Sequence, residues 1–226
     1  NYPEFWSKFW DFSKIKGIKS KKKIKKSKIF HKNLFLPGTK LNFGQNLLSK
    51  NTFDKALTFI IENGYREERS WKQLNLNTAK LVQFFKEMKI VKGDRIAAYM
   101  PNCNETVEAF IASSSIGGIW SSCSPDFGTN GIIERFSQIT PKVLFITDQY
   151  FYNGKKINII ERLSKILKSI PSIKIVVIIN YPGKKYLKTI QKFKKIKFFK
   201  WDNLMKIKPQ QINFNNYDFE TELAIL

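Results

Sequence analysis

The chain has 226 residues, enough for one large domain or two small ones, and 42% of them are hydrophobic, which is ordinary for a globular protein. Its two cysteines, Cys103 and Cys123, exclude a disulfide scaffold and a cysteine-rich zinc module. No apolar run approaches the roughly 20 residues that a membrane-spanning helix needs. We therefore expect a soluble, cytoplasmic protein without a membrane span.

The formal net charge is +22, from 40 basic and 18 acidic residues, and a charge of this size is typical of nucleic-acid-binding proteins. However, 35 of the basic residues are lysine and five are arginine, the residue whose planar fork suits phosphates and base edges. A bias toward residues with A/T-rich codons explains the lysines more simply. We expect no specific nucleic-acid partner, and a lysine-rich nucleic-acid-binding or interaction module remains an alternative of another class.

The first part of the chain predicts little regular structure. Aromatic residues spaced along a helical face between residues 5 and 12 indicate a short helix docked on a larger body. Ten lysines and no acidic residue follow between residues 14 and 32, as is typical of a solvated loop or linker. The single histidine, His31, lies beside this run and is a poor candidate for a catalytic base. Pro37 and Gly38 mark a turn in an irregular segment.

Residues 56–74 predict a β-hairpin. Two strand-like segments flank Asn63-Gly64, a dipeptide suited to a tight type I′ turn. The apolar positions between residues 74 and 88 then predict an amphipathic helix.

From residue 95 onward, buried strand-like runs alternate with helical patterns. Such alternation indicates βαβ units, and therefore an α/β fold with a mostly parallel sheet flanked by helices. The predicted strands are 95–100, 119–124, 142–147 and 174–180, and the predicted helices between them are 104–118, 131–139 and 157–170. The less regular tail predicts a helix at 184–193, a strand at 195–201, an irregular connector at 206–219 and the start of a further strand at 221–226.

One candidate ligand-binding segment follows the predicted strand 119–124. In open α/β sheets, ligands bind just beyond the carboxyl ends of the strands. The segment from Pro125 to Gly128 supplies a turn, an exposed aromatic ring at Phe127 and a glycine that permits close approach. Considered alone, the same residues fit an ordinary strand-to-helix connection better, with Thr129 or Asn130 as the helix cap.

A second candidate segment, residues 147–156, follows the next predicted strand. It combines two tyrosines, the dipeptide Asn153-Gly154 and two lysines, a set that can hold a phosphorylated ligand with an adenine base. A surface turn in a lysine-rich protein explains the composition equally well. The chain contains no glycine-rich nucleotide-binding motif and no cluster with metal-ligand spacing, so no metal site is predicted.

Several segments resemble those of a known protein family in their exact amino-acid sequence. They include YPEFWSKFWDF, FLPGTKLNFGQNLL and VKGDRIAAYMPNCNETVEAFIASSSIGGIWSSCSPDFG, in this order. Up to residue 156, the chain resembles the N-terminal part of the acetoacetyl-CoA synthetases (acetoacetate–CoA ligases), which belong to the adenylate-forming, AMP-binding acyl-CoA synthetase superfamily. The run WSSCSPDFG is the motif most specific to this family, and the resemblance implies that residues 122–128 select acetoacetate. The alternative within the class is an acetyl- or other short-chain acyl-CoA ligase.

The resemblance implies that acetoacetate, ATP and CoA give acetoacetyl-CoA, AMP and pyrophosphate through acetoacetyl-AMP, with Mg²⁺. It implies an extension at residues 1–48, followed at residues 49–226 by the first, incomplete part of the AMP-binding domain. The ATP and Mg²⁺ sites and the catalytic lysine would lie beyond Leu226, so we expect no catalytic residue and no activity in this chain alone. Because the sequence begins with Asn1, we also expect a longer natural polypeptide.

The resemblance also implies a site for the CoA nucleotide. The family's loop G-V-R-x-G-R aligns with residues 150–155, so that Tyr152 replaces its first arginine and Lys155 matches its second. The neighbouring loop, near the CoA adenine, is matched by Phe127 and Gly128. The implied CoA-binding residues are Phe127, Gly128, Tyr152, Asn153, Gly154 and Lys155.

Overall fold

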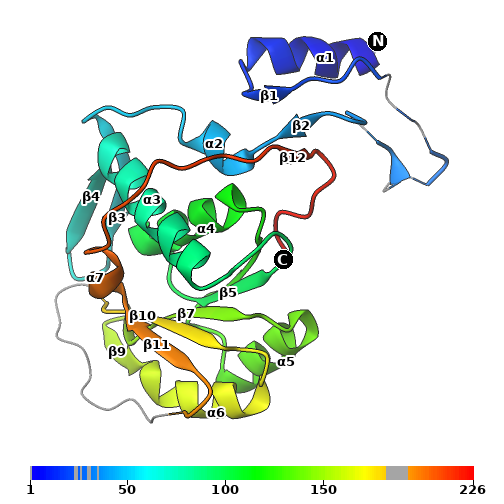
Figure 1. The fold of residues 1–226 in the computed structure, drawn as a ribbon. Coiled ribbons are helices and arrows are strands. Elements are labelled where there is room, and N and C mark those ends of the chain that lie inside the picture. The colour runs from blue at the N-terminus through cyan, green and yellow to red at the C-terminus, as the bar shows by residue number, and fades with distance from the viewer. Residues whose placement is uncertain (1, 23–24, 26, 30–31, 35, 182–192) are drawn as a thin grey trace.

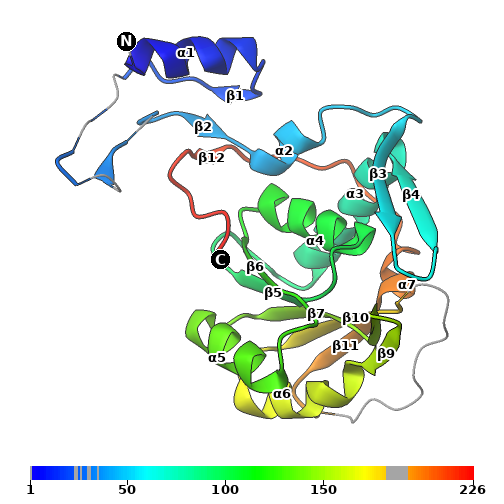
Figure 2. The same ribbon diagram turned by 180° about the vertical axis from the view of Figure 1, so that it is seen from behind.

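Figures 1 and 2 show the computed structural model, which describes residues 2–22, 25, 27–29, 32–34, 36–181 and 193–226. Its centre is a five-stranded sheet in the order β11-β10-β7-β5-β6, in which all neighbours are parallel. These strands are β5 (Arg95–Tyr99), β6 (Ile119–Cys123), β7 (Val143–Thr147), β10 (Ile175–Ile179) and β11 (Lys197–Lys200). The predicted α/β fold with a parallel sheet is confirmed.

Helices cover both faces of this sheet. They are α3 (Trp71–Glu87) and α4 (Asn104–Ser115) on one face, and α5 (Thr129–Ile139) and α6 (Leu163–Ser169) on the other (Figures 1 and 2). Every residue of β7 and β10 is buried. A parallel strand covered on both faces is apolar along its whole length, which is why these strands were recognisable as continuous hydrophobic runs.

Several helix boundaries differ from the prediction. Helix α4 ends at Ser115 rather than at residue 118, and α5 begins at Thr129 rather than at residue 131. Helix α3 begins at Trp71 rather than at residue 74, because Ser70 caps it: the Ser70 side chain accepts the Gln73 N–H, and the Gln73 side chain accepts the Ser70 N–H. The predicted helix 157–170 starts later. Strand β9 (Lys155–Asn158) pairs with β8 (Gln149–Tyr152) and is followed by a 3₁₀ turn, η2 (Ile160–Arg162), before α6.

The predicted hairpin is formed by β3 (Lys55–Ile60) and β4 (Arg66–Ser70), but its predicted type I′ turn is wrong. A type I′ turn needs a positive φ at both central residues, and Gly64 has one whereas Asn63 does not. The loop closes between Ile61 and Tyr65 instead, where the Ile61 N–H donates to the Tyr65 carbonyl at 3.1 Å. This longer loop requires a single left-handed residue.

The remaining elements surround this body. They are α1 (Tyr2–Phe12), β1 (Gly17–Ile18), β2 (Lys40–Leu41), α2 (Phe43–Leu47), α7 (Trp201–Leu204) and β12 (Tyr217–Asp218). Helix α1 lies beside β1 at the periphery (Figures 1 and 2). Of its aromatic face, Trp10 is buried while Phe5, Phe9 and Phe12 stay exposed. Lys19, next to β1, donates to the Ser7 carbonyl and the Asp11 carboxylate of this helix, and its docking on the larger body stays a prediction.

The tail of the chain agrees only in part with the prediction. Strand β11 confirms the strand predicted at 195–201, but Trp201 begins α7 rather than ending the strand. Beside β6, the Trp120 N–H donates to the Leu223 carbonyl and the Ile225 N–H donates to the Trp120 carbonyl, so the last residues add one bridge to the sheet edge. The predicted helix 184–193 lies outside the described residues except for its last position, and His31 lies outside them as well. Among the described helices, none combines the length and apolar character needed to cross a membrane.

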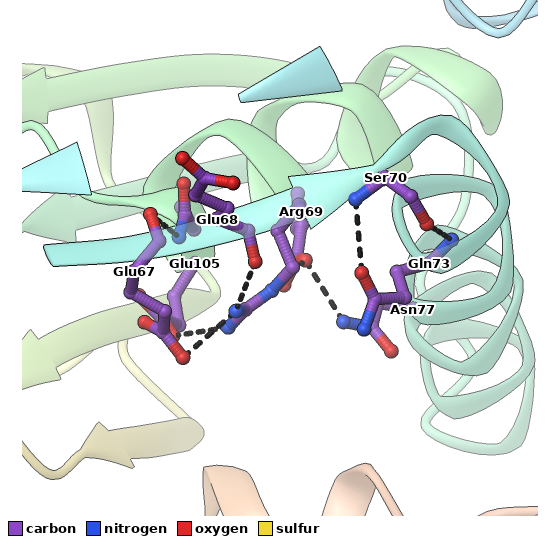
Figure 3. Close-up of polar contacts among 9 residues, drawn as sticks. Glu67, Glu68, Arg69, Ser70, Gln73, Asn77 and Glu105 are labelled. Atoms are coloured by element: carbon purple, nitrogen blue, oxygen red, sulfur yellow. Dashed lines mark hydrogen bonds and ion pairs between the residues drawn. The ribbon is translucent and has the colours of Figure 1, made fainter. Parts of the chain in front are cut away.

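A buried ion cluster attaches the β3–β4 hairpin to the helical layer (Figure 3). The Arg69 guanidinium lies 2.7 Å from the Glu67 carboxylate, 3.1 Å from Glu105 and 3.1 Å from Glu108. The Glu108 side chain is fully buried in α4, and its Oε1 also accepts a hydrogen bond from Asn77 of α3 at 2.8 Å. The cluster therefore joins β4, α3 and α4, and it determines where the tip of the hairpin points.

We predict that Glu108→Gln changes the pH dependence of stability. The pKa of Glu108 is raised to about 7, because burial and the nearby Glu105 together outweigh the lowering effect of Arg69 and Asn77. The folded state therefore keeps this proton above pH 4.5, where the unfolded state loses it, and the resulting stability is lost as the pH rises through 7. Between pH 5 and 8, the free energy of unfolding should fall more in the wild type than in the variant, by roughly 2 kcal/mol.

Urea unfolding at pH 5 and at pH 8 measures this difference. Glu87→Gln is the matched control, because Glu87 is exposed on α3 and should leave the wild-type pH dependence unchanged. Equal losses of unfolding free energy in the wild type and Glu108→Gln would show that Glu108 is ionised throughout this range.

Candidate functional site

The order of the strands creates a crevice at one edge of the sheet. The first strand of the sheet, β5, lies between β6, the second, and β7, the third, so the chain turns in opposite directions on the two sides of β5. Ligands of doubly wound sheets bind outside the carboxyl ends of the strands at such a switch point. Both candidate segments follow strands that border this point: residues 124–128 follow β6, and the hairpin β8–β9 follows β7.

Two side chains, the buried Tyr99 and the partly buried Arg162, hold the 124–128 loop against the sheet. The hydroxyl of Tyr99, the last residue of β5, lies 2.6 Å from the Phe127 carbonyl oxygen and 3.2 Å from that of Pro125. Arg162, at the end of η2, donates to the same two carbonyls at 3.1 and 3.3 Å and also contacts the Tyr99 hydroxyl. Burial raises the pKa of Tyr99, so its hydroxyl stays protonated and can donate. The backbone of the loop is thereby fixed.

Phe127 and Gly128 lie at the exposed end of this loop. The Phe127 ring is 39% exposed, and the Arg135 guanidinium of α5 lies over it, 4.6 Å from the ring centroid. Gly128 precedes α5 as its N-cap with extended backbone angles, and no atom lies within 4 Å of where its Cβ would be. The cap predicted at Thr129 or Asn130 is therefore wrong, because both are already helical residues.

The second candidate segment forms a two-residue β-hairpin. Asn153 and Gly154 both have positive φ, 49° and 68°, as a type I′ turn requires, and the strand residues on either side pair as Tyr152 with Lys155. The type I′ turn that was predicted for Asn63-Gly64 thus occurs at Asn153-Gly154 instead.

The hairpin presents different residues on its two faces. The rings of Tyr150 and Tyr152 stack with centroids 5.8 Å apart and an interplanar angle of 14°. Side chains directly opposite each other on paired strands share a face, so Lys155 lies on the tyrosine face, across from Tyr152. Lys156 is opposite Phe151 and lies on the other face. The two lysines, which are equivalent by composition, therefore occupy different surroundings.

One hydrogen bond joins the two candidate segments. The Tyr150 hydroxyl donates to Oδ1 of Asp126 at 2.7 Å, and Ser124 donates to Oδ2 of the same carboxylate at 2.7 Å. Burial raises the pKa of Tyr150, which keeps its hydroxyl protonated. The tyrosine face of the hairpin is therefore turned toward the 124–128 loop, and the two segments form one continuous surface.

A cavity of about 520 Å³ opens beside this loop. Ser122, Cys123, Phe127 and Arg135 are among the residues that line it. A larger cavity, of about 740 Å³, lies between α3 and residues 210–214 and contains none of the predicted site residues. The cavity beside Phe127 thus adjoins the predicted site.

The predicted residues are brought together, but the residues that organise them were missed. No sequence pattern indicated a role for Tyr99 or Arg162, or for Glu62, which contacts the Asn153-Gly154 turn. Arginine is rare in this lysine-rich chain, and each of the five forms several polar contacts or stacks on a ring: Arg66, Arg69, Arg95, Arg135 and Arg162. That rarity was the available signal for Arg162.

Comparisons with known proteins show similarity along most of the chain. The family model described as AMP-binding enzyme matches residues 50–214. The acetoacetyl-CoA synthetase of Xenopus tropicalis is 41% identical over 184 residues, which are 80% of this chain and 27% of that protein. The acetoacetyl-coenzyme A synthetase of Rhizobium meliloti (strain 1021) is 37% identical over 166 residues, 74% of this chain and 26% of that protein.

A solved structure confirms the fold. The acetoacetyl-CoA synthetase from Streptomyces lividans superimposes with a TM-score of 0.85 and 23% sequence identity, covering 98% of this chain and 33% of that one. This chain thus spans only 27% of the Xenopus protein and 33% of the Streptomyces protein. Because the family model covers most of the chain and the resemblance seen in the sequence is confirmed, the chain belongs to the AMP-binding enzyme family.

Proposed function

We propose that the chain is part of an acetoacetate–CoA ligase. In the proposed reaction, acetoacetate attacks the α-phosphorus of ATP to give acetoacetyl-AMP and pyrophosphate, and the CoA thiol then attacks the acyl carbon and releases AMP. The proposal is supported by the similarity to acetoacetyl-CoA synthetases, which outranks the acetyl- or other short-chain alternative. Residues 122–128 would contribute to acyl selection, because Ser122, Cys123 and Phe127 line the cavity beside the predicted site.

We assign one part of this reaction to the described residues, the binding of the CoA nucleotide. The observation that carries this assignment is the Tyr150–Asp126 hydrogen bond. It joins the β8–β9 hairpin to the 124–128 loop, two segments that the resemblance assigned to CoA separately. On that surface, the half-exposed Tyr152 ring and the Phe127 ring offer apolar faces to a base. Lys155 lies on the same face as Tyr152 and offers a cation to a phosphate.

We assign no catalytic residue and no ATP or Mg²⁺ site within these 226 residues. In this family, a Gly/Ser/Thr-rich loop ending in lysine would hold the phosphates of ATP, and no such loop occurs in the sequence. The proposed division remains an extension at residues 1–48 and a part of the AMP-binding domain at residues 49–226, and the proposed location remains the cytoplasm.

We predict that Lys155→Ala weakens CoA binding. A partly solvated contact between a lysine and a phosphate should contribute on the order of 1–2 kcal/mol, so the dissociation constant for CoA should rise roughly 5- to 30-fold. Titration of the purified chain with CoA, followed by calorimetry or amide NMR, measures this change.

Lys156→Ala is the matched control for this experiment. It removes the same charge from the neighbouring position but on the opposite face of the hairpin, so CoA binding should stay close to that of the wild type. If both variants bind CoA as tightly as the wild type, or if both weaken it equally, the assignment of Lys155 is wrong.

A further prediction is that the 226-residue chain does not carry out adenylation. In the proposed reaction, a phosphate-binding loop and a catalytic lysine stabilise the charge developing on the transferred phosphate, and we assign neither to these residues. The purified chain incubated with ATP, Mg²⁺ and acetoacetate should release no more pyrophosphate than a buffer control. Acetoacetate-dependent release above that control would place the catalytic groups within these residues.

A further inference from the structure

The tips of two hairpins that are distant in sequence meet at Glu62. This residue lies in the loop between β3 and β4, and its carboxylate contacts the turn between β8 and β9. Oε1 accepts the Asn153 N–H at 2.9 Å, and Oε2 accepts the Gly154 N–H at 3.0 Å. Each carboxylate oxygen thus takes one of two consecutive backbone donors.

The geometry of the turn explains why it attracts an anion. In a two-residue hairpin, the two central N–H groups have no acceptor within the strand ladder and point outward. Because Asn153 and Gly154 both adopt left-handed angles, their donors form a small concave site of the kind that binds anions. The two hydrogen bonds lower the pKa of Glu62, as expected for donors that favour the charged form.

Nothing else in the described part of the chain holds this carboxylate. Glu62 is exposed and forms no salt bridge with any described residue. The two N–H groups are therefore its described partners, and another anion can use both. Lys155 follows the turn directly and favours an anion with more charge than a carboxylate carries.

We propose that the Asn153-Gly154 turn is a phosphate-binding cradle and that Glu62 occupies it as a built-in competitor. A phosphate group displaces Glu62 by taking the two N–H groups, and in the free chain Glu62 lowers the affinity for that group. Release of Glu62 also separates the tip of the β3–β4 hairpin from the β8–β9 turn. The inference rests on the proposed function only for the source of the phosphate, which would be the CoA nucleotide.

Titration of the 226-residue chain with inorganic phosphate, followed by amide NMR, tests this proposal. Glu62→Gln keeps the size of the side chain but removes its charge, so phosphate should bind about fivefold more tightly than to the wild type, with the largest shifts at Asn153 and Gly154. Glu68→Gln removes the same charge from the same hairpin, where Glu68 contacts Lys55 and Arg66 instead, and should bind as the wild type does.

Equal or weaker binding by Glu62→Gln would overturn the proposal, as would shifts centred away from the turn. Glu62→Ala, which has no carboxylate or amide to offer the turn, should also bind more tightly, and weaker binding would show that Glu62 orders the turn instead. A parallel titration with CoA separates this inference from the proposed function. If Glu62→Gln strengthens phosphate binding but neither form binds CoA, the cradle stands and the proposed function fails. If the wild type binds CoA but Glu62→Gln changes neither phosphate nor CoA binding, the function stands and the competitor is rejected.

Discussion

Parallel strands all end at the same edge of their sheet, and this constraint determines where the functional surface of the chain lies. With β5 between β6 and β7, the segments that follow these strands are brought to one crevice without any sequence signal of their own. The complete burial of β7 and β10 makes the register of the sheet rigid. The loops can therefore carry polar and exposed residues, because the core beneath them supplies the stability.

Hydrogen bonds then hold the 124–128 loop and the β8–β9 hairpin together as one defined surface. Tyr99 and Arg162 satisfy the carbonyls of Pro125 and Phe127, which would otherwise lose hydrogen bonds to water near the buried sheet edge. Tyr150 adds the contact from the hairpin to the loop. Glu62 belongs to a different hairpin, which the Arg69 cluster attaches to α4, so elements on both sides of the crevice meet at one turn.

Sequence patterns were sufficient to predict the positions of the sheet strands but not the types of the turns. The strands at 95–100, 119–124, 142–147 and 174–180 agree with the structure within one residue at each end. For β7 and β10, burial on both faces leaves a continuous apolar run. Asn63-Gly64 and Asn153-Gly154 look alike in sequence, yet only Asn153-Gly154 forms the type I′ turn, since the pairing of the flanking strands decides the loop length. Contacts such as Tyr150–Asp126 and Glu62 with residues 153–154 join positions 24 or more apart, which local patterns cannot reveal.

The central claim is that the 124–128 loop and the β8–β9 hairpin form one site for the CoA nucleotide, with the hairpin at its 3′-phosphate. The most direct measurement is amide NMR of the wild-type chain titrated with CoA and with dephospho-CoA, which lacks that phosphate. Both ligands should shift Phe127 and Gly128, and only CoA should strongly shift residues 153–155. Identical shifts from the two ligands, or shifts centred on residues 210–214 beside α3, would contradict the account.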